Sequence, residues 1–157
     1  MLYPAQLYKE ELKTKLIEYW YDPKYQFYFV DCQREFEVPK SAEERKDLVH
    51  LDKDGNIDGY FSYFHNKPSR SLTNFGLMSF KDNNISFIRD VIRHMDSLWK
   101  NKAVRRIEFW AFADNPAVQG YSNIISRYGG YIAATLKETE WFDGKYHDTI
   151  IFEMLQD

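Results

Sequence analysis

The first part of the chain carries apolar residues at helical spacing. Between Ala5 and Tyr21 they recur every three or four positions, at Tyr8, Leu12, Leu16, Tyr19 and Trp20. That interval places them on one face of an α-helix. The helix should end at Asp22-Pro23, because a residue before proline avoids helical geometry. Beyond it, Tyr25 to Val30 fits either a short helix or a strand, and the polar residues 33–47 predict a surface loop or short helix.

The pattern then changes to that of β-strands. Leu48 to Asp52 and Ile57 to His65 are rich in β-forming residues and flank Lys53-Asp54-Gly55-Asn56. An Asp-Gly pair between two such segments is a strong hairpin signal. A further strand is expected from Leu72 to Phe80.

A helix and a strand follow in alternation. The helix, residues 85–101, opens after Asn83-Asn84 and has one apolar face formed by Ile88, Val91, Ile92, Met95, Leu98 and Trp99. The next strand, Val104 to Ala113, is apolar on both faces in its second half, as expected for a central strand.

A second helix and a hairpin complete the chain. Asn115-Pro116 begins the helix and Gly129-Gly130 ends it, because proline suits the first helical turn and glycine suits the residue after the last. The strands Tyr131 to Trp141 and Tyr146 to Leu155 form the hairpin around Asp143-Gly144.

Together these elements predict an α/β (α+β) fold, a mixed central sheet flanked by helices. Strands 72–80 and 104–113 form a right-handed βαβ unit with the helix between them, so they should be a central parallel pair. We expect this pair to separate at its carboxyl ends, where open α/β sheets bind ligands. No long linker divides the chain, so residues 1–157 should form one domain.

Charge and composition exclude two classes of protein. The 21 Lys and Arg against 24 Asp and Glu give a net charge of −3, which excludes nucleic-acid binding driven by backbone charge. The longest uncharged run, Asn115 to Ser126, is too short to cross a membrane as a helix. Cys32 is the only cysteine and the first residues lack a basic, apolar leader, which favours a reducing, cytoplasmic location.

Short motifs follow one another in a defined order toward the end of the chain. A strand ends in Ala113-Asp114-Asn115-Pro116-Ala117, a helix ends in Tyr128-Gly129-Gly130, and a hairpin carries Asp143-Gly144-Lys145-Tyr146-His147-Asp148. In this order and spacing they resemble the GNAT family, the GCN5-related N-acetyltransferases, and the similarity covers most of residues 48–157. The resemblance implies a GNAT-like fold with a C-terminal β-hairpin, acetyl-CoA as cofactor, and acetyl transfer to an amine.

The resemblance also implies roles for individual residues. A backbone N–H near Leu77, Met78 and Ser79 would polarise the thioester carbonyl while a neutral amine attacks it, and Asn115 would contribute to cofactor binding. In the family, a tyrosine on the following helix protonates the departing thiolate, and Tyr121 is the candidate. An alignment anchored on the glycines after the helix instead places Ile125 there, and Tyr121 would then only cover the sheet.

The loop before the first of these two helices departs from the family pattern. Family members carry Gln/Arg-x-x-Gly-x-Gly/Ala, whose backbone N–H groups bind the coenzyme A pyrophosphate. Here residues 80–87 contain no glycine, and Asp82 adds a negative charge. We therefore expect weak or undetectable binding of acetyl-CoA.

Two interpretations of this loop are open. Asn83 and Asn84 tolerate positive φ and could form a substitute anion site, together with Lys81, Ile85 and Ser86 at the start of the helix. Alternatively, Asn84 only caps the helix.

The histidines suggest little further chemistry. None of the four has metal-ligand spacing with a second histidine or a cysteine, so no metal site is expected. His94 should lie near the polar side of its helix and pair with Asp90, four residues earlier. His50 and His65 on strands are candidate bases, and His147 in the last hairpin should be structural.

The choice between an enzyme and a binding module is open. A GNAT-like fold that has lost its cofactor loop would be a binding or regulatory module. The 12 Phe, 12 Tyr and 4 Trp also allow a sugar or peptide binder. The acceptor, a small-molecule or peptide amine, is not identified. Acidic residues that suit a cationic amine, or simply a solvated face, are Glu35, Glu37, Glu43 and Glu44. A homodimer is a further open alternative.

Overall fold

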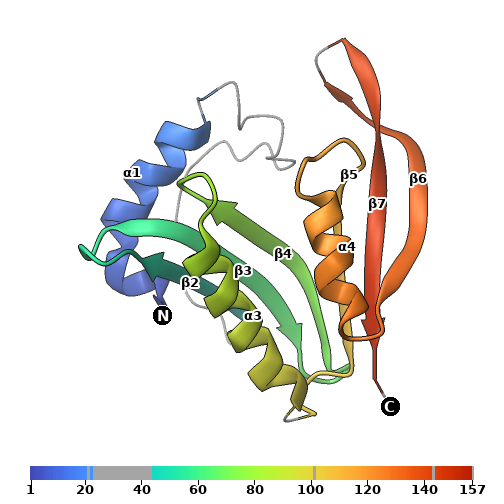
Figure 1. Cartoon of the computed structure of the whole chain (residues 1–157), viewed down its shortest axis with the longest axis horizontal. Coiled ribbons are helices and arrows are strands. Elements are labelled where there is room, and N and C mark those ends of the chain that lie inside the picture. Colours follow the sequence, from blue (N-terminus) through green and yellow to red (C-terminus); the bar gives the residue numbers. More distant parts are fainter. Residues whose placement is uncertain (21, 23–43, 101, 143, 157) are drawn as a thin grey trace.

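A computed structural model describes residues 1–20, 22, 44–100, 102–142 and 144–156. Its centre is a seven-stranded sheet in the order β1-β2-β3-β4-β5-β7-β6 (Figure 1). The strands are β1 (Leu2–Pro4), β2 (Arg45–Leu51), β3 (Ile57–Asn66), β4 (Ser71–Ser79), β5 (Arg106–Phe112), β6 (Tyr131–Phe142) and β7 (Lys145–Leu155). The helices are the 3₁₀ turn η1 (Ala5–Tyr8), α1 (Lys9–Trp20), α3 (Ile85–Lys100) and α4 (Val118–Ser126). Among these described helices, none has the length and apolar character needed to cross a membrane.

One neighbouring strand pair of this described sheet is parallel. β4 and β5 run in the same direction, whereas the other neighbouring pairs are antiparallel. The parallel pairing joins Ser71 to Arg106 and Leu72 to Ile107, and the two strands diverge beyond it (Figure 1). The predicted mixed sheet, with a central parallel pair that separates at its carboxyl ends, is therefore confirmed.

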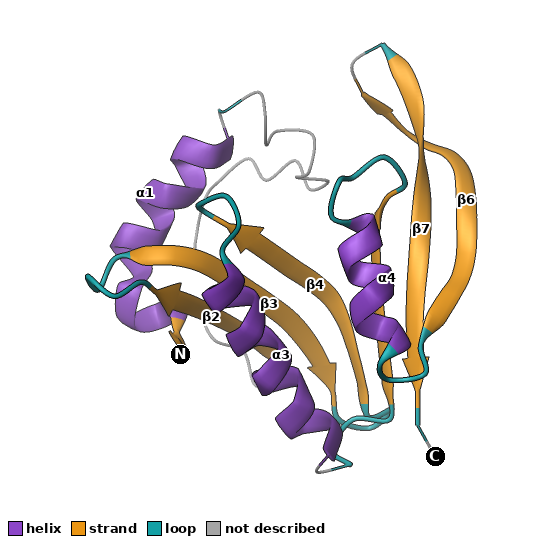
Figure 2. Ribbon diagram, viewed as in Figure 1, coloured by secondary structure: helices purple, strands orange, loops and turns teal. Residues whose placement is uncertain are grey.

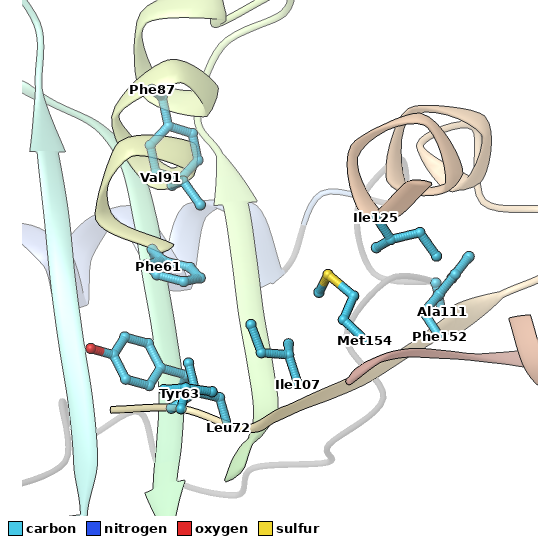
Figure 3. Close-up of a cluster of buried hydrophobic side chains, with 11 residues drawn as sticks. Phe61, Tyr63, Leu72, Phe87, Val91, Ile107, Ala111, Ile125, Phe152 and Met154 are labelled. Carbon is cyan, nitrogen blue, oxygen red and sulfur yellow. The ribbon is translucent and has the colours of Figure 1, made fainter. Parts of the chain in front are cut away.

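The helices cover both faces of the sheet (Figure 2). Phe61 of β3 packs in one buried cluster with Phe87 of α3 and Ile125 of α4, and Figure 3 shows these helix side chains directed toward the sheet. Tyr60, the preceding residue of β3, packs in a second cluster with Leu12 of α1. Because neighbouring strand residues point to opposite faces, α3 and α4 share one face and α1 lies on the other.

The N-terminal elements differ from the sequence prediction. Residues 2–4 form an unpredicted strand, β1, along β2. β2 begins at Arg45 rather than Leu48, because its first three polar residues complete the ladder with β3. The predicted first helix begins as a 3₁₀ turn at residues 5–8. The stretch 25–30 and Cys32 lie outside the described residues.

The start of α4 also differs from the prediction. The helix begins at Val118 rather than Pro116. The Asn115 side-chain oxygen accepts a hydrogen bond from the N–H of Ala117 at 2.8 Å. This bond holds residues 115–117 in a separate turn before the helix. At the other end, the helix ends at Ser126, and the predicted Gly129, with φ of +70°, lies in the turn that follows it.

A bulge interrupts β4 in the region where it separates from β5. Ser62 pairs with Gly76 and Phe64 with Thr73, so the residue between them on β3 faces two residues of β4. One of these two, Asn74, has φ of +51°, a left-handed conformation that asparagine tolerates better than most residues. Bulges bend the strand that carries them, and this one helps β4 to curve away from β5.

His94 contradicts the expectation that it pairs with Asp90. Its ring packs beside Phe61 and Tyr63, and its Nε2 lies 2.8 Å from the Tyr63 hydroxyl. Asp90 instead contacts His50 and Arg93. The reason is that His94 lies at the sheet side of α3, and burial there lowers the pKa of its imidazole. Burial raises the pKa of Tyr63 to about 12, so its hydroxyl keeps its proton beside the ring nitrogen of His94.

Stability should therefore decrease as the pH falls below about 6.5, the ordinary pKa of histidine. The folded-state pKa of His94 is lower than its unfolded value, so over this range the unfolded chain binds the proton first and is favoured. His94→Gln should lose less stability than the unaltered protein between about pH 7 and pH 5 in urea unfolding. As a control, Tyr63→Phe keeps the histidine and should keep the pH dependence. Parallel profiles for His94→Gln and the unaltered protein would contradict this assignment.

Candidate active site

A cavity of about 930 Å³ lies where β4 and β5 separate. Its walls come from β3, β4, β5, α3 and α4, with Leu16 of α1 and Arg45 of β2 on the far side. In the described sheet, β4 has no pairing with β5 from Thr73 to Ser79. This strand edge therefore presents backbone N–H and C=O groups that a ligand can satisfy. The volume falls within the range of ligand pockets, which makes this cavity the candidate active site.

The structure separates the predicted site residues into two groups. Those that line the cavity are Leu77, Met78, Asn115 and Tyr121. Those outside its described lining are Ser79, Asn83, Asn84, Ile85 and Ser86. Most of the second group belongs to the loop before α3 and the first turn of that helix. The roles predicted for both groups remain predictions.

Tyr121 projects from α4 toward the sheet side of the cavity. Its ring meets Phe109 and Phe152 edge to face, with centroid separations of 5.6 and 6.2 Å. Burial raises the pKa of the Tyr121 hydroxyl, so it is protonated at neutral pH. That is the protonation state a general acid requires.

Asn115 also lines the cavity, at the turn between β5 and α4. Besides its side-chain bond to Ala117, its backbone N–H donates to the carbonyl of Phe112 at 3.0 Å. The residue therefore fixes the path of the chain at the cavity wall. A contribution to cofactor binding would add to this structural role.

Asn84 caps α3 from a buried position. Its Oδ1 accepts hydrogen bonds from the Phe87 N–H at 3.2 Å and from the Ser86 hydroxyl at 3.0 Å. Its Nδ2 donates to the carbonyl oxygen of Asp58 at 2.8 Å. The capping interpretation therefore describes the Asn84 side chain. Its amide oxygen accepts hydrogen bonds and its amide nitrogen donates one, all within the protein.

Other polar groups of this loop are also engaged within the protein. Asn83 has φ of +51°, and its carbonyl accepts the Ile85 N–H at 2.7 Å. Lys81 Nζ lies 2.5 Å from Asp58 Oδ2, and this hydrogen bond raises the pKa of the lysine. A phosphate at this loop would have to compete with these partners, which supports the expectation of weak cofactor binding.

Asn84→Ala should lower the free energy of unfolding by about 1–2 kcal/mol. The change removes the cap of α3 and leaves the Asp58 carbonyl without its donor. Urea unfolding of the purified variant measures the loss. Asn84→Ser keeps a cap acceptor and removes the amide donor without adding a charge, so it should lose less. A cost for Asn84→Ser equal to that of Asn84→Ala would show that the cap contributes nothing.

The histidines lie away from the large cavity or hold the hairpin. His50 is buried with one ring nitrogen against Asp58 and the other 3.3 Å from Asp90, and it lines a separate cavity of about 530 Å³. Neither His50 nor His65 is among the described residues lining the large cavity. His147 Nδ1 lies 2.7 Å from Asp114 Oδ2, which ties the hairpin to the end of β5, the structural role predicted for it.

The sequence did not reveal a polar cluster formed by Arg45, Asp47 and Tyr60. Arg45 Nε lies 3.2 Å from each carboxylate oxygen of Asp47. The Tyr60 hydroxyl donates to Asp47 Oδ1 at 2.5 Å. Arg45 and Tyr60 line the large cavity. The local pattern gave no signal for it, because Arg45, Lys46 and Asp47 are consecutive charged residues in a segment interpreted as a loop.

Solved structures share this fold. No protein-family model matches the chain, and no curated protein matches its sequence. A chimera of the spermidine N-acetyltransferase SpeG from Vibrio cholerae and hSSAT is 23% identical with a TM-score of 0.59, covering 73% of this chain and 71% of that one. Spermidine N-acetyltransferase from Vibrio cholerae in complex with CoA and spermine is 18% identical with a TM-score of 0.58, covering 73% and 67%.

A third neighbour is named for a different substrate. A protein assigned as a phosphinothricin N-acetyltransferase is 16% identical with a TM-score of 0.58, covering 74% of each chain. The fold of this protein is therefore the GNAT fold, as the sequence motifs predicted. At these identities, the comparisons establish the fold alone.

Proposed function

We propose that this protein is an acetyl-CoA-dependent N-acetyltransferase that acts on an amine. The observation that carries the proposal is the cavity between the diverging strands β4 and β5, because it combines an unpaired strand edge with a protonated tyrosine. The GNAT fold of the N-acetyltransferase neighbours supports it.

The residues of the cavity fit the acyl-bearing arm of the cofactor. Leu77, Met78 and Ser79, on the unpaired edge of β4, would hold that arm by backbone hydrogen bonds. Asn115 would contribute from the turn between β5 and α4. The start of α3 would hold the pyrophosphate, with the donors that its internal hydrogen bonds leave available.

The bound cofactor supplies a thioester as the acetyl donor. The amine nitrogen forms a C–N bond to the acetyl carbon while the C–S bond breaks, and a β4 backbone N–H stabilises the developing charge on the carbonyl oxygen. Tyr121 gives its proton to the departing sulfur. The proton lost by the amine returns to Tyr121 through solvent, so the enzyme ends unchanged.

Calorimetric titration with acetyl-CoA, combined with an assay of thiol release in the presence of amines, tests this function. We expect saturable binding weaker than micromolar and thiol release that depends on the amine. Binding at micromolar Kd or tighter would show that the interpretation of the loop is wrong while supporting the enzyme. Absence of both binding and thiol release at millimolar acetyl-CoA would overturn the proposal.

That negative outcome would favour the second candidate, a GNAT-fold binding or regulatory module. The observation in its favour is the loop before α3, where Asn84 and Lys81 already have partners within the protein. Such a module would keep the cavity and its ligand but would not release thiol.

A further inference from the structure

The charge of the large cavity carries information about the acceptor. Its walls are mostly apolar and aromatic, and Trp110 and Phe112 contribute to them. Among the described lining residues, Arg45 is the one with a charged side chain. Aspartate and glutamate, which would hold a cationic polyamine, do not occur in this described lining.

Arg45 reaches the cavity from the face of the sheet that carries α1. Arg45, Asp47 and Val49 alternate along β2 and therefore share one face. Val49 packs in the cluster of Leu12 on α1, which identifies that face. Tyr121 approaches from the opposite face, with α4. An acceptor bound to Arg45 would thus approach from the face of the sheet opposite to that of Tyr121, the proposed proton donor.

Asp47 holds the Arg45 side chain in place but leaves part of it accessible to a ligand. The Arg45 side chain is 31% exposed, whereas that of Asp47 is 3% exposed, so the cation is the half of the pair that a ligand can reach. Asp47 contacts the Nε edge of the guanidinium. Burial and the neighbouring carboxylate raise the pKa of Tyr60 to about 12, so its hydroxyl remains a donor to Asp47. Arg45 also has a side-chain hydrogen bond with Tyr60, so a ligand would bind to the guanidinium N–H groups that Asp47 and Tyr60 leave available.

We propose that the acceptor is an amine that also carries a carboxylate, such as an amino acid with an apolar side chain. A planar guanidinium binds a carboxylate with two parallel hydrogen bonds, and the apolar walls suit the rest of such a molecule. A polyamine would instead place a second cation near Arg45. This inference rests on the proposed function and names its substrate class; the transfer step itself is unchanged.

Leucine and leucinamide form a matched test, because both have the same amine and apolar side chain and only leucine has a carboxylate. Calorimetry without acetyl-CoA measures their binding, and thiol release measures kcat and KM, with spermidine as the polyamine. We expect leucine to be preferred over leucinamide by roughly 10- to 100-fold, as for a charge-assisted hydrogen-bonded pair. Spermidine should do no better than leucinamide.

Variants then assign the preference to Arg45. Arg45→Gln should remove the preference through KM, with kcat largely kept, and Arg45→Lys should keep part of it. Arg45→Gln alone leaves the buried carboxylate of Asp47 without its cation, which lowers stability. The double variant Arg45→Gln/Asp47→Asn removes both charges and therefore avoids this buried unpaired carboxylate. Arg105→Gln, an exposed arginine outside the described lining, is the control and should change nothing.

The outcomes separate this inference from the function on which it rests. Equal or better binding of leucinamide or spermidine, or a leucine preference that survives in the double variant, would overturn the inference even in an active enzyme. Absence of acetyl-CoA binding and thiol release would overturn the proposed function. A leucine preference in the calorimetry would then still support a carboxylate site at Arg45.

Discussion

Tyr121→Phe should lower kcat for acetyl transfer by roughly 100-fold, the usual contribution of a general acid. Tyr121 lines the cavity, and burial raises the pKa of its hydroxyl, so it holds a proton that the departing thiolate needs. Phenylalanine keeps the ring contacts with Phe109 and Phe152. The free energy of unfolding should therefore change little, and steady-state kinetics should show the loss in kcat rather than in KM.

Tyr146→Phe provides a matched control. This tyrosine lies on the β6–β7 hairpin and is 56% exposed, so removal of its hydroxyl should leave kcat unchanged. Turnover by Tyr121→Phe equal to that of the control would reduce Tyr121 to a packing residue. The position anchored on the helix end, Ile125, has no proton to donate, and the reaction would then proceed without a side-chain acid from α4.

Phe152→Ala should lower the free energy of unfolding by about 3–5 kcal/mol, as large-to-small changes in a core do. Phe152 of β7 is fully buried and stacks on Phe109 at 4.9 Å. Its ring also meets that of Tyr121. The change would leave a void beneath α4, and urea unfolding should show a large decrease in midpoint. In the fraction that remains folded, Tyr121 would lose a support, so kcat should also fall.

Leu155→Ala, on the same strand, is the control. It tests whether the loss of stability in Phe152→Ala comes from the burial of Phe152 rather than from its place in β7. Leu155 is 43% exposed, and surface substitutions usually change stability by less than about 0.5 kcal/mol. Phe152→Leu should lie between the two, because leucine fills part of the space. A Phe152→Ala variant as stable as Leu155→Ala would contradict the packing described for this cluster.

Local pattern was sufficient for most of the secondary structure, although not for β1, and for much of the topology. The Asp54-Gly55 turn forms between β2 and β3, with φ of +87° at the glycine. The apolar spacing in residues 85–101 produced α3, and the short βαβ connection made β4 and β5 parallel. These features depend on neighbours within a few residues or on the handedness of one crossover, so the sequence carries them directly.

The candidate site was predicted only in part, because the pairing of the strands brings together residues that are far apart in the sequence. Leu77, Met78, Asn115 and Tyr121 were expected at the cleft and line its cavity. The role of Asn84 depends on the carbonyl of Asp58, 26 residues earlier. No local sequence pattern indicates that this carbonyl lies next to the start of α3. The sequence therefore left both the capping and the anion-binding interpretations of Asn84 open.

The sequence by itself determined the kinds of elements from β2 onward, their order, and the parallel pair around which the cavity opens. Tertiary structure alone decided what the cavity presents to a ligand. Asp47 pairs with Ser62 across β2 and β3, which makes Tyr60 its diagonal neighbour. That register brings the tyrosine hydroxyl to the carboxylate and holds Arg45 at the cavity wall. A register shift by one residue would turn these side chains to the other face, which is why the composition of residues 45–60 could not reveal the cluster.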